Sequence, residues 1–216
     1  MMNRKILVFI LALTLSSLLF AGCAQTAANK ANSANSNKDA AIKSNAQPIA
    51  DDEIAIIETD WGTFKIEFYS NIAPKAVARF KELAREGVYN GTSFHRVNPN
   101  LGMIQGGDPL SKDNIPANVG TGKSDKPNVP AEFSDILFDK GIVGAARERD
   151  GNDTANSQFF IMTKRQQAFD KRYTVFGKVI EDPSNTVNLI AGAPTAPNSE
   201  RPEEKITVKS VTIQKR

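Results

Sequence analysis

From residue 53 onward, the chain consists of short runs of hydrophobic and β-branched residues separated by turns rich in Gly, Pro, Asn and Asp. In residues 53–69, EIAIIETDWGTFKIEFY, two such runs flank Asp60-Trp61-Gly62, which predicts a β-hairpin. Further runs that predict strands are TSFHRV (92–97), GMIQGG (102–107), GIVGAA (141–146), SQFFIM (157–162), TVFGKV (174–179) and ITVKSVTI (206–213). Many short strands at close intervals indicate a mainly β fold, with a barrel as the expected form.

Two segments carry helical patterns. In residues 73–87, Pro74 suits a first helical turn, and Val77, Phe80 and Leu83 form a hydrophobic stripe that ends before Gly87. A second short helix is predicted over residues 186–191. The few helices are expected to lie outside the barrel.

The first 23 residues have the pattern of an export signal. Arg4 and Lys5 precede fifteen mostly apolar residues, a run too short for a membrane span of about 20 residues and typical of a signal peptide. The segment ends in FAGC, which resembles a bacterial lipobox, although Phe20 stands where leucine is usual. We expect lipidation of Cys23, and the alternative is a plain secretory signal followed by a chance cysteine.

Three segments follow from these patterns. Residues 1–22 are the predicted lipoprotein signal peptide, and residues 23–51, rich in Ala, Asn, Ser and Lys, are predicted to be a lipid-anchored flexible tether. Residues 52–216 form the predicted folded domain. We therefore expect an extracytoplasmic protein anchored to the bacterial cell envelope, with the choice between inner and outer membrane left open.

Charge and composition exclude several classes of function. The chain has 27 Lys and Arg against 24 Asp and Glu, and loss of Arg4 and Lys5 with the signal peptide leaves 25 basic residues. This balance predicts no nucleic-acid partner. Cys23 and His95 are the only residues of their kinds, so we expect no disulfide and no metal site. The segment ANVGTGKS (117–124) lacks the first glycine of a phosphate-binding loop, and we expect no cofactor.

The positive signal for a site lies on three predicted strands. Side chains alternate between strand faces, so Met103 and Gln105 share one face, as do Gln158 and Phe160. Together with Arg96 these residues would form one surface of a guanidinium, two amides and hydrophobic side chains. The alternative is that Arg96 braces the backbone and that Met103 and Phe160 belong to the core.

Several motifs occur together in one order: FHRV, MIQGGDP, GTGK, VPAEF, GIVGAAR, SQFFI and FDKRYTVFGKV. In this order and spacing they resemble the cyclophilin family of peptidyl-prolyl isomerases over residues 53–213. The resemblance implies a closed, eight-stranded antiparallel barrel capped by two helices. It also implies an enzyme that accelerates rotation about Xaa-Pro bonds. The extracytoplasmic address predicts exported proteins as substrates, with no cofactor, and because nothing in the sequence indicates an oligomer we expect a monomer.

The resemblance also implies roles for individual residues. By position, Arg96 matches the catalytic arginine and Gln105 the glutamine beside it. The remaining matches are substrate-binding positions: Met103, Ala146, Arg147, Gln158, Phe160, Phe169 and Tyr173.

Some positions depart from the common family pattern. One additional residue lies between the arginine and the glutamine, so either Leu101 or Gly102 takes the place of a pocket phenylalanine. Arg147 replaces a groove asparagine, and Tyr173 a histidine. Ala168 replaces a tryptophan, so we expect cyclosporin-type ligands to bind weakly.

A reaction that only rotates a bond explains why this group of residues contains no nucleophile or acid–base pair. Cis and trans Xaa-Pro bonds differ by about 1 kcal/mol but exchange slowly, over tens of seconds or more. A guanidinium near the proline nitrogen would stabilise the twisted state. The alternative function is a tethered chaperone module that binds proline-containing polypeptides with little isomerase activity.

The predicted lipid anchor can be tested directly. Mass spectrometry of the mature protein purified from bacterial membranes is expected to find Cys23 as the N-terminal residue, carrying acyl chains. An unmodified Cys23 thiol in the mature chain would contradict the anchor.

Overall fold

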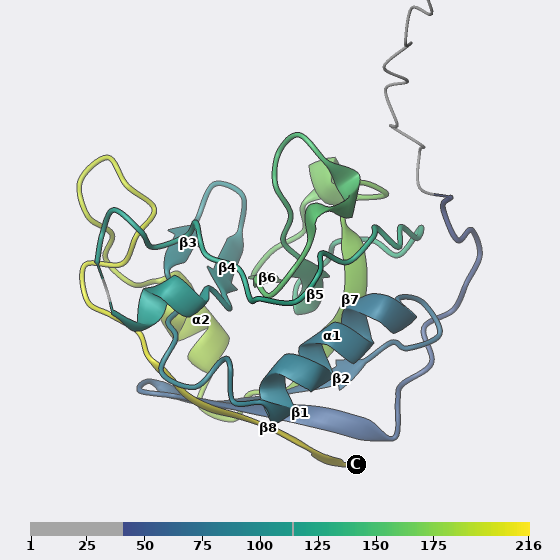
Figure 1. Ribbon diagram of the computed structural model, residues 1–216, viewed down its shortest axis with the longest axis horizontal. Helices are drawn as coiled ribbons and strands as arrows, with labels where there is room; N and C mark the ends of the chain where they lie inside the picture. Colours follow the sequence, from purple (N-terminus) through teal and green to yellow (C-terminus); the bar gives the residue numbers. More distant parts are fainter. Residues whose placement is uncertain (1–40, 114) are drawn as a thin grey trace, which may run out of the picture. The chain divides into compact units, whose positions relative to one another are not determined.

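The computed structural model describes residues 41–113 and 115–216 of the chain (Figure 1). The predicted signal peptide, Cys23 and the tether as far as residue 40 lie outside this part. In the part that is described, no helix combines the length and the apolar character needed to cross a membrane.

The described part contains one eight-stranded antiparallel sheet. Its strands pair in the order β3-β4-β6-β5-β7-β2-β1-β8. Their bounds are β1 Glu53–Thr59, β2 Gly62–Phe68, β3 Arg96–Asn98, β4 Met103–Gly106, β5 Ile142–Ala145, β6 Phe159–Met162, β7 Thr174–Glu181 and β8 Val208–Lys215. The two helices are α1 Pro74–Arg85 and α2 Thr186–Ala191, and three short 3-10 helices are η1 Pro109–Lys112, η2 Asn152–Thr154 and η3 Gln167–Phe169. The predicted mainly β class, strand number and two helices are confirmed.

The sheet curls into a half-barrel, and its strands do not close the ring that the expected closed barrel would have. The edge strands β3 and β8 do not form a ladder with each other; the residues before them make one bridge, between Ser93 and Thr207. The amide of Phe94 donates to the carbonyl of Ile206 at 3.0 Å on one side of this bridge. The predicted run 92–97 therefore becomes a strand only from Arg96, because its first residues close the curl.

The predicted hairpin and helices occur where the sequence pattern places them. Thr59 pairs with Gly62 across the two-residue turn between β1 and β2. Gly62 has φ +139°, and a Cβ on it would lie 2.3 Å from the hydroxyl of Thr186 in α2, so only glycine fits. Helix α1 begins at Pro74, and α2 spans the six residues predicted for it.

Helix α1 packs against β7 and β8, and α2 against β2, β3 and β4 (Figure 1). No side chain of α1 caps its own start; instead the amides of Lys75 and Ala76 donate to the carboxylate of Glu132, each with a contact of 3.0 Å. A carboxylate there satisfies free amides and complements the positive end of the helix.

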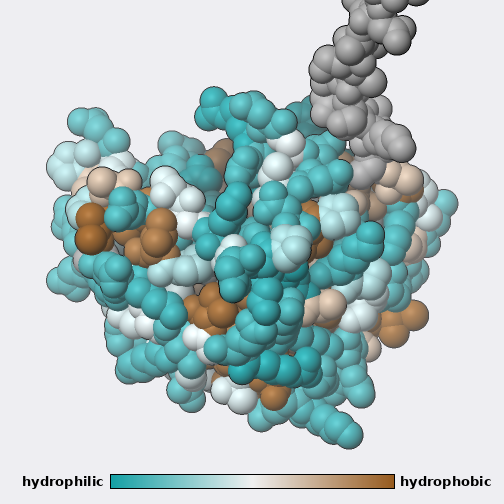
Figure 2. Space-filling model, viewed as in Figure 1, coloured by the Kyte–Doolittle hydropathy of each residue, from teal (hydrophilic) through white to brown (hydrophobic). Residues whose placement is uncertain are grey.

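Strand alternation divides the hydrophobic side chains between two clusters. Phe159 belongs to the larger cluster with Phe80 of α1, and the neighbouring Phe160 belongs to the smaller one with Met103 and Phe138. On the face shown in Figure 2, hydrophobic side chains form separate small areas within a largely hydrophilic surface. The smaller cluster contains Met103 and Phe160, two of the residues predicted to form the site.

Residues 43–51, assigned to the tether by their composition, contact the domain. The amide of Lys43 donates to the carbonyl of Phe133 at 2.9 Å, and that of Asn45 donates to the carboxylate of Asp135 at 2.7 Å. Asp51 forms an ion pair with Lys81 of α1, with 2.8 Å between the charged atoms. This segment is thus held against the domain before β1 begins.

Candidate active site

The candidate site is built on three neighbouring strands. Arg96 on β3 is directly opposite Gln105 on β4, and Gln105 is directly opposite Phe160 on β6. Gln158 lies one residue before β6. The register of the sheet therefore brings together residues that are up to 64 positions apart in the sequence.

A chain of side-chain hydrogen bonds connects these residues. Arg96 Nη1 donates to Gln105 Oε1 at 3.0 Å, and Gln105 Nε2 donates to Gln158 Oε1 at 2.8 Å. Gln158 Nε2 then donates to the carbonyl oxygens of Gly120, at 3.1 Å, and Gly122, at 2.8 Å. All three side chains are partly exposed.

Both ends of this chain dictate the direction of its bonds. A guanidinium can only donate, so the amide oxygen of Gln105 must face Arg96; the glycine carbonyls can only accept, so the amide nitrogen of Gln158 must face them. The two amides have no alternative orientation that keeps all the bonds. One Nε2 hydrogen of Gln105 remains available for a further acceptor.

Beside the hydrogen-bonded chain lies the smaller hydrophobic cluster. The ring of Phe160 stacks on Phe138, with centroids 5.7 Å apart, and meets the rings of Phe169 and Tyr173 edge-on, each at 5.5 Å. Gly144 makes this arrangement possible, because a Cβ there would lie 2.4 Å from the Phe160 ring. Phe160 is buried, while Phe169 and Tyr173 are partly exposed.

Leu101 and Gly102, the two candidates for the position of the pocket phenylalanine, differ in their surroundings. Leu101 is partly exposed and packs against the cluster that contains Met103 and Phe160. Gly102 has φ +68°, and a Cβ there would lie 2.1 Å from the side chain of Lys164. Leu101 therefore occupies the position of the hydrophobic wall.

The other positions taken from the resemblance lie around the same cluster. Ala146 packs against it, and the guanidinium of Arg147 lies 4.8 Å from the centre of the Tyr173 ring. Arg147 also donates to the carbonyls of Glu148, at 3.0 Å, and Arg172, at 3.4 Å. Arg147 thus buttresses Tyr173 and does not contact the Arg96–Gln158 chain.

A cavity of about 350 Å³ borders the two glutamines. It is lined by both glutamines, by the loop of residues 120–123 and by residues of the 146–158 segment. Arg147 and Glu148 line it as well, so its wall carries both charges. Ala146 packs against the hydrophobic cluster and also lines this cavity, so the two lie next to each other.

Comparison with known proteins identifies the family of this chain. Residues 54–213 match the family described as cyclophilin type peptidyl-prolyl cis-trans isomerase/CLD. The chain belongs to the cyclophilin family. A Brucella abortus protein named a probable peptidyl-prolyl cis-trans isomerase is 46% identical over 129 residues, which cover 58% of this chain and 65% of that protein. The mouse peptidyl-prolyl cis-trans isomerase-like 1 is 40% identical over 129 residues, covering 58% of this chain and 72% of that protein.

A solved cyclophilin also has a similar structure. The crystal structure of a Cryptosporidium parvum cyclophilin type isomerase, determined in the presence of the dipeptide Ala-Pro, has a TM-score of 0.67 and 28% sequence identity. The match covers 76% of this chain and 99% of that one. The present chain spans 65% of the length of the Brucella relative, just under two thirds.

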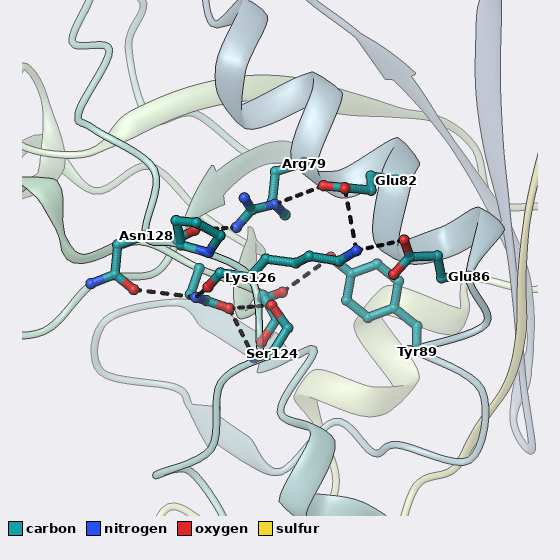
Figure 3. Close-up of polar contacts among 10 residues, drawn as sticks. Arg79, Glu82, Glu86, Tyr89, Ser124, Lys126 and Asn128 are labelled. Carbon is teal, nitrogen blue, oxygen red and sulfur yellow. Dashed lines mark hydrogen bonds and ion pairs between the residues drawn. The ribbon is translucent and has the colours of Figure 1, made fainter.

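In this cyclophilin, the loop of residues 120–128, whose carbonyl groups accept hydrogen bonds from Gln158, also forms ion pairs with helix α1 (Figure 3). Lys126 Nζ forms ion pairs with Glu86, at 2.7 Å, and with Glu82, at 3.4 Å. Arg79 forms an ion pair with Glu82, at 3.1 Å, and donates to the carbonyl of Pro127, at 2.6 Å. Because a single exposed ion pair contributes little to stability, the loop is held by the network of these charges and not by any one pair.

Asn156 connects the same loop to the segment that leads through Gln158 into β6. Its Oδ1 accepts from the amide of Ser124, at 2.8 Å, and its Nδ2 donates to the carbonyl of Lys126, at 2.9 Å. The segment ANVGTGKS therefore forms a loop whose Gly120 and Gly122 carbonyls orient Gln158.

His95 lies behind this site. Its side chain is buried, and neither ring nitrogen has a hydrogen-bond partner in the described part of the chain. Burial lowers the pKa of His95, against the opposing influence of the Asp108 carboxylate. His95 directly precedes β3 and is a buried packing residue, whose ring lies next to Gly120.

Three parts of the site were not found from the sequence. Phe138 stacks on Phe160, Glu200 forms an ion pair with Arg96, and the Gly120 and Gly122 carbonyls receive Gln158. Phe138 and Glu200 lie outside the motifs that carry the family resemblance. Only the glycines belonged to such a motif, GTGK.

Asn156→Ala is expected to loosen the loop of residues 120–128, because it removes the acceptor for the Ser124 amide. The amide of Ser124 should exchange with deuterium at least tenfold faster, which corresponds to the loss of about 1.4 kcal/mol of local protection. Asn128→Ala is the control, since Asn128 makes only a 3.2 Å contact to Asn156. Equal exchange rates in the two variants would contradict the bracing role of Asn156.

The free energy of unfolding is expected to fall as the pH decreases from 7.5 to 5.5. In the unfolded chain His95 binds a proton near pH 6.5, whereas the buried ring in the folded protein resists protonation. The contribution of His95 to the free energy of unfolding is therefore fully present above that pH and is lost as the pH falls below it. The loss should be about 1 kcal/mol, measured by urea unfolding at both pH values. Because the chain has one histidine, His95→Gln should remove most of this dependence, and an unchanged dependence would contradict the assignment.

Proposed function

We propose that this protein catalyses cis–trans isomerisation of Xaa-Pro peptide bonds while anchored by a lipid to the outside of the cytoplasmic membrane or to the outer membrane. The observation that carries the proposal is the arrangement of Arg96. Its guanidinium is held on a strand at two of its nitrogens, remains partly exposed, and lies in a row with Gln105 beside a hydrophobic cluster.

The proline ring would contact the partly exposed rim of the smaller hydrophobic cluster. Leu101, Phe169 and Tyr173 form this rim, above the buried Met103 and Phe160. The free Nε2 hydrogen of Gln105 would donate to a carbonyl oxygen of the substrate. This would hold one side of the Xaa-Pro bond while the other side rotates.

Arg96 would act on the rotating bond itself. Amide resonance gives a barrier of about 18–20 kcal/mol, and the proline nitrogen regains a lone pair when rotation breaks that resonance. A guanidinium that donates to this nitrogen binds the twisted state more tightly than either planar isomer, which is the condition for catalysis. Arginine suits the role because it stays charged and presents donors in a rigid plane.

The magnitudes require more than one interaction. A rate enhancement of about 10⁵ needs roughly 7 kcal/mol of transition-state stabilisation. One hydrogen bond from a charged group contributes about 1.5–3 kcal/mol. Orientation of the peptide by Gln105 and the hydrophobic rim, together with loss of water from the site, would supply the remainder.

The anchor and the substrates form the second part of the proposal. The export signal in residues 1–22 and the cysteine at position 23 support attachment to the cell envelope, and residues 24–40 would give the domain reach from the membrane. Newly exported proteins that contain proline would then be the substrates.

Arg96→Ala is expected to lower the catalysed rate about ten- to hundredfold, since it removes one charge-assisted hydrogen bond from the transition state. The measurement is the proline-limited refolding of a model protein, with circular dichroism to check the fold of the variant. Arg85→Ala is the control, because it removes a guanidinium that pairs only with Glu53.

A wild-type rate in Arg96→Ala would exclude the proposed role of Arg96. A wild-type protein that binds proline peptides without accelerating their exchange would instead be a proline-binding chaperone module.

A further inference from the structure

A second hairpin holds a carboxylate against the candidate catalytic arginine. Residues 194–203 fold back on themselves, with the amide of Ala196 donating to the carbonyl of Arg201 at 2.9 Å and Asn198 at the tip with φ +56°. The backbone of this hairpin also binds β3, since the amide of Val97 donates to the carbonyl of Glu200 at 2.7 Å. In Figure 1 it is the yellow-green loop beside β3.

Both oxygens of the Glu200 carboxylate are used. Oε2 accepts from Arg96 Nε, and Oε1 accepts from Asn98 Nδ2. Asn98 is itself oriented, because its Oδ1 accepts from the amide of Leu101 at 2.7 Å. The position of the carboxylate is therefore determined from the hairpin on one side and from β3 and its following turn on the other.

This arrangement leaves one edge of the guanidinium available. Glu200 binds Nε and Gln105 binds Nη1, whereas Nη2 donates to no residue in the part of the chain that is described. A long arginine side chain that is 37% exposed would otherwise sample several rotamers. Two acceptors on adjacent nitrogens restrict both the tilt and the rotation of the guanidinium plane.

We propose that Glu200 is a positioning residue that holds Arg96 in its productive orientation. This inference rests on the proposed isomerase function and names a residue, 104 positions away in the sequence, through which the site is preorganised. Glu200 contributes through Arg96 and does not contact the substrate. Its carboxylate takes no part in the hairpin's own bonds, which are made by backbone groups and the hydroxyl of Ser199.

The test measures catalysis and binding separately. Exchange NMR with a saturating Ala-Pro peptide gives the isomerisation rate on the enzyme, and a titration gives the dissociation constant. Glu200→Ala is expected to lower the rate about tenfold and to change the dissociation constant less than about twofold, since a displaced catalytic group affects mainly the transition state. Glu204→Ala, which removes an exposed carboxylate directly after the hairpin, should leave both unchanged.

A double-mutant cycle tests whether Glu200 acts through Arg96. In an Arg96→Lys background the Nε donor is absent, so adding Glu200→Ala is expected to change the remaining rate less than about twofold. A further tenfold loss in that background would overturn the proposal, as would a Glu200→Ala rate equal to that of Glu204→Ala.

A rescue variant guards against a purely structural loss. Glu200→Gln keeps an acceptor for Arg96 Nε but turns its amide nitrogen toward the amide nitrogen of Asn98. Combining it with Asn98→Asp restores a donor–acceptor pair, and this double variant is expected to recover most of the lost rate. No recovery in a normally folded double variant would count against positioning by this bond network.

A spectroscopic signature separates this inference from the proposed function. The Nε–H signal of Arg96 should exchange slowly with water in the wild-type protein and in Glu204→Ala, and much faster in Glu200→Ala. Equal exchange in all three would overturn the positioning role even if the enzyme is active. A slow signal in a wild-type protein without isomerase activity would refute the proposed function and leave the Glu200–Arg96 bond established.

Discussion

The site depends on a hydrogen-bonded row in which each bond determines the direction of the next. Arg96 can only donate, and the Gly120 and Gly122 carbonyls can only accept, so Gln105 and Gln158 between them each have one orientation. The row runs across three strands, whose register is maintained by backbone bonds. A row of this kind holds a partly exposed guanidinium in one orientation, whereas a surface arginine normally samples several.

The curled sheet has two faces, one that packs into the larger core and one that carries the smaller cluster beside the row. Successive phenylalanines on β6 face opposite sides, so Phe159 joins the larger core while Phe160 forms the floor of the smaller cluster beside the row. Gly144 on the neighbouring strand leaves room for the Phe160 ring. The core and the site therefore share strand β6, and a large change at Gly144 would displace Phe160 and Phe138 of the smaller cluster.

The sequence was sufficient for elements whose signals are local. The β1–β2 hairpin, the start of α1 at Pro74 and all of α2 follow from turn residues and periodicity. Strand alternation alone grouped Arg96, Gln105 and Gln158 as one possible surface, but only the family resemblance favoured that reading over a structural one. Neither could choose between Leu101 and Gly102, because the choice depends on backbone conformation and on the distant side chain of Lys164.

The residues that escaped prediction are those brought in by tertiary structure. Glu200 lies in a segment that reads as an ordinary turn, and its approach to Arg96 follows from the closing of the curl at residues 93 and 207. Phe138 lies in an irregular segment, where no periodicity identifies a buried face. The most direct measurement of the central claim is a crystal structure of the domain with an Xaa-Pro peptide. Our account predicts the proline ring on the rim of Leu101, Phe169 and Tyr173, with Arg96 Nη2 directed at the Xaa-Pro bond. A proline ring bound in the 350 Å³ polar cavity, with Arg96 turned away from the peptide, would contradict it.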